Sequence, residues 1–135
     1  MFDDITTRTL TAAMHGANMR QAVLAQNLAN ADTPGYKRQD VEFESALAEA
    51  VRDDRDQIAA ARRAGDSLPM ARELSIAQVE PSITTESNTA VRVDGSNVDP
   101  DNEMSKLAAN QLSYNTVTAL LDARFGQMRM VIAGR

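Results

Sequence analysis

The sequence predicts an elongated, all-α fold in which long helices at the two ends of the chain pair in a coiled-coil-like way. In both terminal segments apolar residues recur at alternating steps of three and four, which is typical of helices that pack along a seam. Aromatic residues make up only 4% of the chain and tryptophan is absent, so a thick globular core is not expected. We therefore expect the chain to complete its burial against copies of itself or against partners.

The N-terminal segment, residues 1–38, is predicted to be one long helix that ends at a tight turn. An aspartate near the start, Asp3 or Asp4, can cap the first helical turn. The helix would run for about 28 residues, or roughly 42 Å. Pro34 and Gly35 then suit the two central positions of a type II turn, because glycine readily adopts positive φ. The predicted seam of this helix consists of Leu10, Met14, Ala17, Gln21, Leu24, Leu28 and Ala31.

The middle segment, residues 39–98, carries the charge imbalance of the chain. Residues 41–98 contain eleven acidic and six basic residues, which accounts for the whole formal charge of −5. Residues 45–64 are rich in helix formers and are predicted to be a second helix. Residues 65–98 mix prolines, serines and threonines with short β-branched runs at 83–85 and 91–93, which predicts an extended, partly irregular connector with room for one short hairpin. This acidic segment is expected to face solvent, while the electrically balanced ends meet other protein surfaces.

The C-terminal segment, residues 99–135, carries the clearest helix signals in the chain. Asp99 is placed as the N-cap and Pro100 as the first helical residue, and Asp101 and Glu103 oppose the helix dipole. A second seam follows, formed by Met104, Leu107, Gln111, Tyr114, Thr118, Leu121, Phe125, Met128 and Ile132. We hypothesise that the polar interruptions of the two seams help to fix the register between the terminal helices.

Catalytic and metal-binding patterns are lacking in this sequence. His15 is the only histidine and cysteine is absent, so a nitrogen or sulfur metal site cannot be assembled. The acidic run at 94–103 lacks the glycine and glutamate spacing of a calcium loop. Asp53 and Asp54 are interpreted as a pair on a solvated helix face, and the serines have no histidine base. We therefore expect no enzyme activity, no catalytic, metal or cofactor-binding residues, and no cofactor.

Composition also excludes two further classes. No basic run or face is available to neutralise phosphates, so nucleic acid is not an expected partner. No apolar run approaches the roughly 18 residues of a transmembrane segment. The N-terminus lacks the continuous apolar core of a cleaved signal peptide, so any export is expected to use another route.

Residues 26–38, QNLANADTPGYKR, closely resemble the N-terminal signature of the flagellar rod, hook and hook-associated axial proteins of bacteria. The VEFE continuation and the tail from residue 93 to residue 114 resemble the proximal rod proteins in particular. The resemblance covers residues 5–44 and 90–133, and residues 45–89 are interpreted as variable filler. The signature residues are Asn27, Leu28, Asn30, Thr33, Pro34, Gly35, Tyr36, Lys37 and Arg38.

The resemblance implies a structural subunit of the flagellar basal-body rod in the periplasm. Its terminal helices would form an inner axial domain, and its copies would stack helically to transmit torque and line the export channel. The implied partners are further copies, other rod proteins, the rod-to-ring adaptor protein, the membrane-ring protein and the flagellar export gate. Export would use the flagellar type III system without a cleaved signal. Judged from the residues alone, a non-enzymatic coiled-coil adaptor that binds one partner through its helices stays open.

Two roles are open for the polar residues of the signature. Asn27 and Asn30 are expected to hydrogen-bond to backbone or to neighbouring subunits near the helix end. Tyr36, Lys37 and Arg38 can offer an aromatic face and positive charge to a neighbour. The alternative is an ordinary helix stop with solvated polar side chains.

Overall fold

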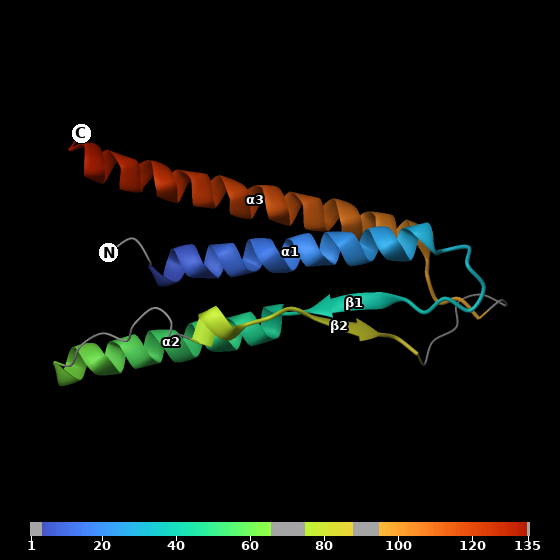
Figure 1. The fold of residues 1–135 in the computed structure, drawn as a ribbon, viewed down its shortest axis with the longest axis horizontal. Helices are drawn as coiled ribbons and strands as arrows, with labels where there is room; N and C mark the ends of the chain where they lie inside the picture. Colours follow the sequence, from blue (N-terminus) through green and yellow to red (C-terminus); the bar gives the residue numbers. More distant parts are fainter. Residues whose placement is uncertain (1–3, 66–74, 88–94, 135) are drawn as a thin grey trace.

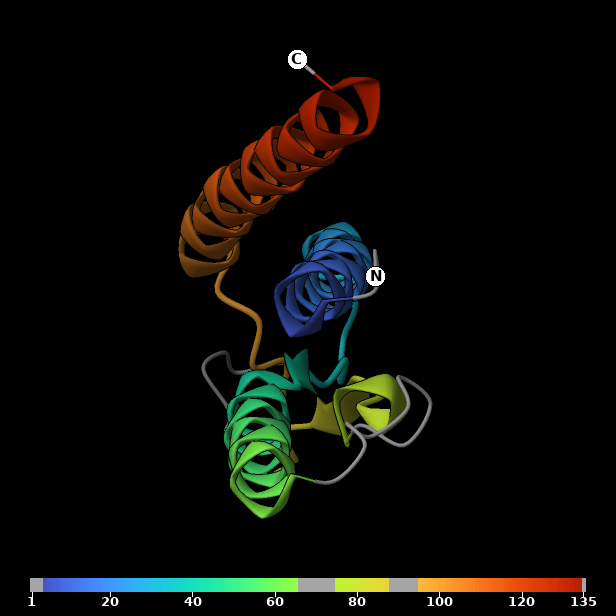
Figure 2. The same ribbon diagram turned by 90° about the vertical axis from the view of Figure 1, so that its left-hand side faces the viewer.

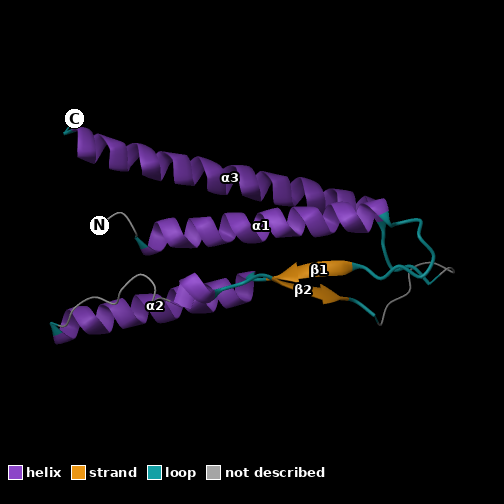
Figure 3. Ribbon diagram, viewed as in Figure 1, coloured by secondary structure: helices purple, strands orange, loops and turns teal. Residues whose placement is uncertain are grey.

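The computed structural model describes residues 4–65, 75–87 and 95–134, and this part of the chain is mostly helical (Figures 1 and 3). The helices are α1 (Ile5–Ala29), α2 (Glu44–Ala64) and α3 (Pro100–Ala133), with a short 3-10 helix, η2 (Ser75–Gln78). Strands β1 (Gln39–Glu42) and β2 (Ser82–Thr85) form a small sheet. The predicted long terminal helices are confirmed, and α2 begins one residue before the predicted second helix.

Helix α1 stops at the Pro-Gly turn that the sequence predicts. The helix has 25 residues, and the amide N–H of Asn30 still donates to the carbonyl oxygen of Gln26 at 3.1 Å. The Tyr36 N–H then donates to the Thr33 carbonyl at 3.2 Å, and Gly35 between them has a φ of +72°. Both observations fit a turn with glycine in its third position. The turn sends the chain back along α1 as β1.

The sheet shows that the expectation of an all-α fold is incomplete. β1 pairs antiparallel with β2, with Val41 opposite Ile83 and Gln39 opposite Thr85. The β-branched run at 83–85 therefore does form a strand, but its partner is β1. The other β-branched run, at residues 91–93, lies outside the described residues. Sequence reasoning left room for one short hairpin within this connector, whereas the partner strand of β2 lies far back along the chain, before α2.

The apolar core lies on the side of α1 that faces the sheet and α2. It is formed by Val23, Val41, Phe43, Leu47, Ala50 and Ile76. The Phe43 ring packs against Gly16 in the middle of α1, and it fits there because a Cβ at Gly16 would overlap the end of the ring. The described part of residues 45–89 therefore contributes to the fold, since α2 and η2 supply half of this core, and the interpretation of the segment as variable filler stays a prediction.

Helix α3 lies antiparallel to α1 on the opposite side from the core (Figures 1 and 2). The amide of Asn110 donates to the Ala17 carbonyl at 2.9 Å, and the Arg124 guanidinium contacts the Asp4 carboxylate at 2.7 Å. The two helices lie closest where α3 begins and separate toward its C-terminus. Residues after Arg124 therefore extend beyond the start of α1.

The predicted seam residues occupy different environments in the two helices. In α1 they are buried or half-buried: Leu10, Met14, Ala17, Gln21, Leu24, Leu28 and, just past its end, Ala31. In α3 the half-buried ones are Leu107, Tyr114, Thr118, Leu121 and Met128. The solvent-exposed ones are Met104, Gln111, Phe125 and Ile132. Pairing of the two helices as a coiled coil, and the domain division at residues 38 and 98, stay predictions.

Candidate functional site

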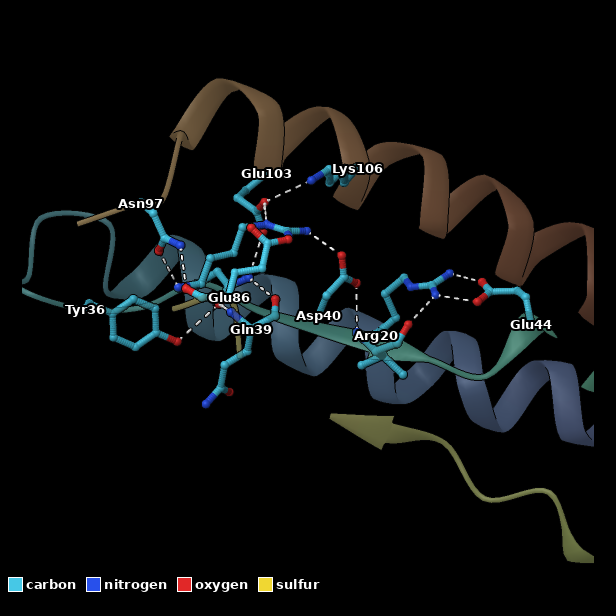
Figure 4. A network of polar contacts seen from close by, with 12 residues as sticks. Arg20, Tyr36, Gln39, Asp40, Glu44, Glu86, Asn97, Glu103 and Lys106 are labelled. Carbon is cyan, nitrogen blue, oxygen red and sulfur yellow. Dashed lines mark hydrogen bonds and ion pairs between the residues drawn. The ribbon is translucent and has the colours of Figure 1, made fainter. Parts of the chain in front are cut away.

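A cluster of polar side chains joins the turn after α1 to the first turns of α3, and we call it the turn cluster (Figure 4). Its members come from α1, the turn, β1, the segment after β2 and the start of α3. They are Asn27, Tyr36, Arg38, Asp40, Glu86, Asn97, Glu103 and Lys106. Segments distant in the sequence are thus tied together at one end of the molecule.

Asn27 is fully buried, and its side-chain amide forms hydrogen bonds through both its nitrogen and its oxygen. Its Nδ2 donates to the Gln39 carbonyl at 2.7 Å and to Glu103 Oε2 at 2.9 Å. Its Oδ1 accepts the Gln39 N–H at 3.0 Å and the Tyr36 hydroxyl at 3.2 Å. An asparagine can donate two hydrogen bonds and accept two, so its capacity is filled. Asn27 thereby holds β1 and α3 against the last turns of α1.

Arg38 is buried and faces three carboxylates from three parts of the chain. Its Nε donates to Glu103 at 2.7 Å, its Nη2 to Asp40 at 2.6 Å, and its Nη1 to Glu86. Burial opposes the charge on the guanidinium, but the hydrogen bonds and charges of Glu103 and Asp40 outweigh it and raise the pKa of Arg38. The arginine therefore remains charged, and its fixed fork of donors sets the angles at which the carboxylates approach.

Glu103 is the carboxylate at the centre of the cluster. It is 1% exposed, and besides Arg38 and Asn27 it contacts Lys106 Nζ at 3.5 Å. Sequence reasoning gave Glu103 the task of opposing the helix dipole, and its position in the first turn of α3 fits that task. Glu103 also has a second role, because its burial and its ion pair with Arg38 hold the start of α3 beside the turn.

Asn97 closes the cluster from the segment before α3. Its Oδ1 accepts the backbone N–H of Arg38 at 2.6 Å, and its Nδ2 donates to the Glu86 carbonyl at 2.8 Å. The Asp99 side chain then caps α3 by accepting the Asp101 N–H at 3.1 Å, as predicted. Hydrogen bonds from the side chains of Asn97 and Asp99 to backbone groups therefore fix the path of the chain into α3.

Other polar residues of the signature also form hydrogen bonds within the chain. Asn30 Nδ2 donates to the Gln26 carbonyl at 2.8 Å, and its Oδ1 accepts from the Thr33 hydroxyl at 3.4 Å. Lys37 Nζ donates to the Gly95 carbonyl at 2.9 Å. Pro34 lies exposed in the turn. Contacts of these residues with neighbouring subunits stay a prediction.

A second ion pair lies along β1 near the cluster. The Arg20 guanidinium donates to Glu44 Oε2 at 2.7 Å and to the Val41 carbonyl at 2.6 Å, and it lies over the Phe43 ring at 5.5 Å from its centroid. The hydrogen bond from Arg20 lowers the pKa of Glu44. For Asp40, burial acts in the opposite direction, but the hydrogen bond from Arg38 prevails and lowers its pKa. Both carboxylates thus remain ionised at neutral pH.

A direct hydrogen bond joins the polar positions of the two predicted seams. Gln21 Nε2 donates to Gln111 Oε1 at 3.0 Å, across the interface between α1 and α3. The two polar interruptions therefore lie opposite each other. Their effect on register is a prediction that this contact supports.

Sequence reasoning missed the role of Asp54, which it placed on a solvated face. The side chain is 1% exposed, and its two oxygens accept the N–H groups of Ser75 at 2.6 Å and Ile76 at 3.0 Å. Asp54 thus fastens η2 to α2 and positions Ile76 in the core. No local pattern could have revealed this, because the N–H groups come from a distant segment.

Among residues 4–65, 75–87 and 95–134, no three histidine or acidic side chains are grouped to hold a metal ion. No helix in this part of the chain has both the length and the apolar character needed to cross a membrane. The carboxylates of the turn cluster are engaged by arginine, asparagine and lysine. The arrangement is suited to fixing one segment against another.

Comparison with known proteins identifies the class of assembly. A family model described as flagella basal body rod protein matches residues 8–37, which cover most of α1 and the turn that follows it. The flagellar basal body rod protein FlgB of Borrelia hermsii is 36% identical over 116 residues, covering 85% of this chain and 86% of that protein. The chain belongs to the FlgB family of flagellar basal body rod proteins. FlgB of Escherichia coli K12 is 31% identical over 97% of this chain and 96% of its own length, and FlgB of Bacillus subtilis strain 168 is 30% identical over 96% and 94%.

Membership of the FlgB family gives the chain its role. It is a structural subunit of the flagellar basal-body rod, and the family is not one of enzymes. The matched segment 8–37 includes Asn27 and Tyr36 of the turn cluster. The relatives also span α2 and α3, which indicates that the whole arrangement belongs to the family.

Proposed function

We propose that this subunit packs into the rod through its paired terminal helices, and that the turn cluster holds α3 in a fixed direction for that packing. The observation that carries the proposal is the exposed apolar surface of α3. Val131 is 79% exposed and Leu112 is 69% exposed. The exposed apolar side chains of this helix are Met104, Leu112, Leu120, Phe125, Met130, Val131 and Ile132.

Such a surface is costly for a protein that works alone. Burial of a large apolar side chain contributes about 1.5–3 kcal/mol, so several exposed ones mark a contact surface. The contacts between α1 and α3 cover one side of α3 and leave Leu112 and Leu120 on the other. Neighbouring subunits in a helical stack would cover that side, because a heterologous contact repeats indefinitely.

The remaining parts of the proposal follow from the family and from this geometry. Helical stacking would let the subunits transmit torque and line the export channel, with the rod lying in the periplasm. The partners would be further copies, other rod proteins, the rod-to-ring adaptor, the membrane-ring protein and the export gate. Passage through the type III apparatus would suit a chain without disulfides, whose core consists of few large side chains.

Incorporation into basal bodies tests the proposal. Leu112→Ser with Leu120→Ser should leave the isolated subunit folded, because both side chains are exposed, but should reduce the amount recovered in purified basal bodies. Ser113→Ala with Asp122→Ala on the same helix is the matched control and should be recovered like the unaltered chain. Equal recovery of both variants would contradict packing through this face. A discrete dimer of the unaltered chain that never enters basal bodies would favour the coiled-coil adaptor instead.

A further inference from the structure

A hollow lined by arginines lies between the start of α1 and the second half of α2, and we call it the arginine groove (Figures 1 and 2). Its volume is about 460 Å³. It lies at the opposite end of the molecule from the turn cluster, and no residue of α3 lines it. Its apolar lining residues are Ile5, Ile58 and Ala59, and its basic ones are Arg55, Arg62 and Arg63.

The apolar residues form the floor of the groove. Ile58 and Ala59 come from α2, Ile5 comes from the first turn of α1, and all three are half-buried. A surface that binds a bilayer lets its apolar side chains enter the lipid, whereas these side chains lie at the bottom of a recess. The floor is therefore better suited to receive apolar side chains of a protein.

The arginines stand along the groove with a regular spacing. Arg55 and Arg62 are seven residues apart on α2, which places them on the same face about 10.5 Å apart along the helix axis. Arg63 adjoins Arg62, and all three side chains are exposed. In the part of the chain that the structure describes, no ion pair engages these three guanidinium groups. Positive charge thus flanks the apolar floor without compensation.

Nearby acidic groups and the helix dipole do not account for this arrangement. Asp4 also lines the groove, but its carboxylate is held by Arg124 at 2.7 Å. Arg62 and Arg63 lie in the last turn of α2 and oppose its dipole. Arg55 lies in the middle of the helix, where the dipole offers no such benefit, and the apolar floor serves no purpose in capping.

We propose that the arginine groove binds an amphipathic helix of another protein, with two acidic side chains two turns apart and apolar side chains between them. The forked guanidinium groups of Arg55 and Arg62 would each take one carboxylate, and the apolar side chains would fill the floor. This goes beyond the proposed function, because it assigns a partner chemistry to a surface that packing through α3 does not use. The formal charge of the chain is −5, so an acidic partner is repelled elsewhere and directed to this groove.

A second copy of the chain does not offer the matching pattern. In its three α-helices, Glu49 and Asp56 are the acidic residues that stand seven apart. The positions between them that would meet the floor are Arg52 and Asp53, which are charged. The occupant is therefore expected to come from a different protein.

A synthetic peptide tests the proposal with the purified full chain. The probe is a labelled helical peptide of alanine and glutamine, with two glutamates seven positions apart and two leucines at the third and fourth positions after the first glutamate. Fluorescence anisotropy at low salt measures its binding. Arg55→Gln with Arg62→Gln should weaken binding about tenfold, since two charge-assisted contacts are lost. Arg52→Gln with Arg129→Gln makes the same charge change at exposed positions outside the groove and should bind like the unaltered chain.

Two further probes separate the helix from a simple anion. A peptide of the same composition with its glutamates four positions apart should bind more weakly, because its carboxylates cannot reach both arginine positions. Inorganic phosphate should displace the first peptide no better than chloride at equal ionic strength, because one phosphate cannot span two helical turns. Displacement by phosphate alone, or equal affinity for the two peptides, would overturn the proposal.

Other results would also overturn it. They are no binding of the first peptide, or equal weakening in the groove variant and the control variant. Binding of vesicles containing anionic phospholipid that depends on Arg55 and Arg62, without peptide binding, would make the groove a lipid-facing surface. Should the groove variant lose its helical circular dichroism, the comparison of the two peptides on the unaltered chain decides. Recovery of the chain in basal bodies without peptide binding would defeat this inference alone, whereas its absence from basal bodies would defeat the proposed function and leave the peptide result standing.

Discussion

Removal of the arginine from the turn cluster should destabilise the isolated subunit strongly. In Arg38→Met the methionine keeps much of the apolar stem but leaves Glu103 buried at 1% exposure without its main cation. Breaking a buried ion pair from one side typically costs about 3–5 kcal/mol. Glu103 would keep the Asn27 amide at 2.9 Å and Lys106 at 3.5 Å, which favours the lower part of that range. The partly exposed pairs of Arg38 with Asp40 and Glu86 add about 1 kcal/mol or less each.

The measurement is urea unfolding followed by circular dichroism. A loss of about 3–4 kcal/mol would lower the urea midpoint by about 2 M at a typical dependence on urea. The double variant Arg38→Met with Glu103→Met removes both charges, so it should lose clearly less than the sum of the single losses. Arg52→Met, at an exposed position on α2, is the control and should change stability by about 0.5 kcal/mol or less. A loss under about 1 kcal/mol in Arg38→Met, or additive losses in the double variant, would refute the reasoning.

Three further predictions concern the core, the pH dependence and the helix register. Gly16→Ala should lower the free energy of unfolding by about 1–3 kcal/mol, because the added Cβ meets the Phe43 ring, although alanine has the better helix propensity. Adding Phe43→Leu to this variant should recover part of the loss, as measured by urea unfolding. The lowered pKa of Glu44 contributes stability that is present above its unfolded pKa of about 4.3 and is lost as pH falls through the lower folded pKa. Glu44→Gln should therefore show a shallower loss of stability below about pH 4 than the unaltered chain, and parallel curves would exclude this contribution. Gln21→Leu with Gln111→Leu should retain helix content but broaden the distances between spin labels on α1 and α3, and a single unchanged distance would remove the register hypothesis.

Local sequence patterns predicted the helices well where a start or stop signal lies next to the helix end. Asp99 and Pro100 begin α3, and Pro34 with Gly35 ends the first helical segment, all by short-range effects. The core was harder to place because α1 has two packing faces. Ala17 and Gln21 of its predicted seam contact α3, whereas Gly16 and Val23 face the sheet and α2.

The candidate site was predictable only in part. The sequence indicated that the asparagines near the end of α1 form hydrogen bonds, and Asn27 makes four of them, to Gln39, Glu103 and Tyr36. Which carboxylate would meet Arg38 could not be predicted, since Glu103 is 65 residues away and carries ordinary signals of a helix start. Such pairs depend on how the chain folds back on itself, and the residue pattern within one segment does not predict which distant segment will lie beside it.

Besides its apolar core, this subunit buries polar groups at one end and leaves apolar groups of α3 exposed. Arg38, Glu103 and Asn27 are buried at one end, while Leu112 and Leu120 on α3 remain in contact with water. Hydrogen bonds and ion pairs are directional, so the buried polar groups can hold α3 at one angle before any neighbour arrives. Apolar contact is non-directional and scales with area, so it can be left to whichever subunit covers the exposed face. We expect such a subunit to present a defined surface as a monomer and to become more stable when neighbours cover the exposed face of α3.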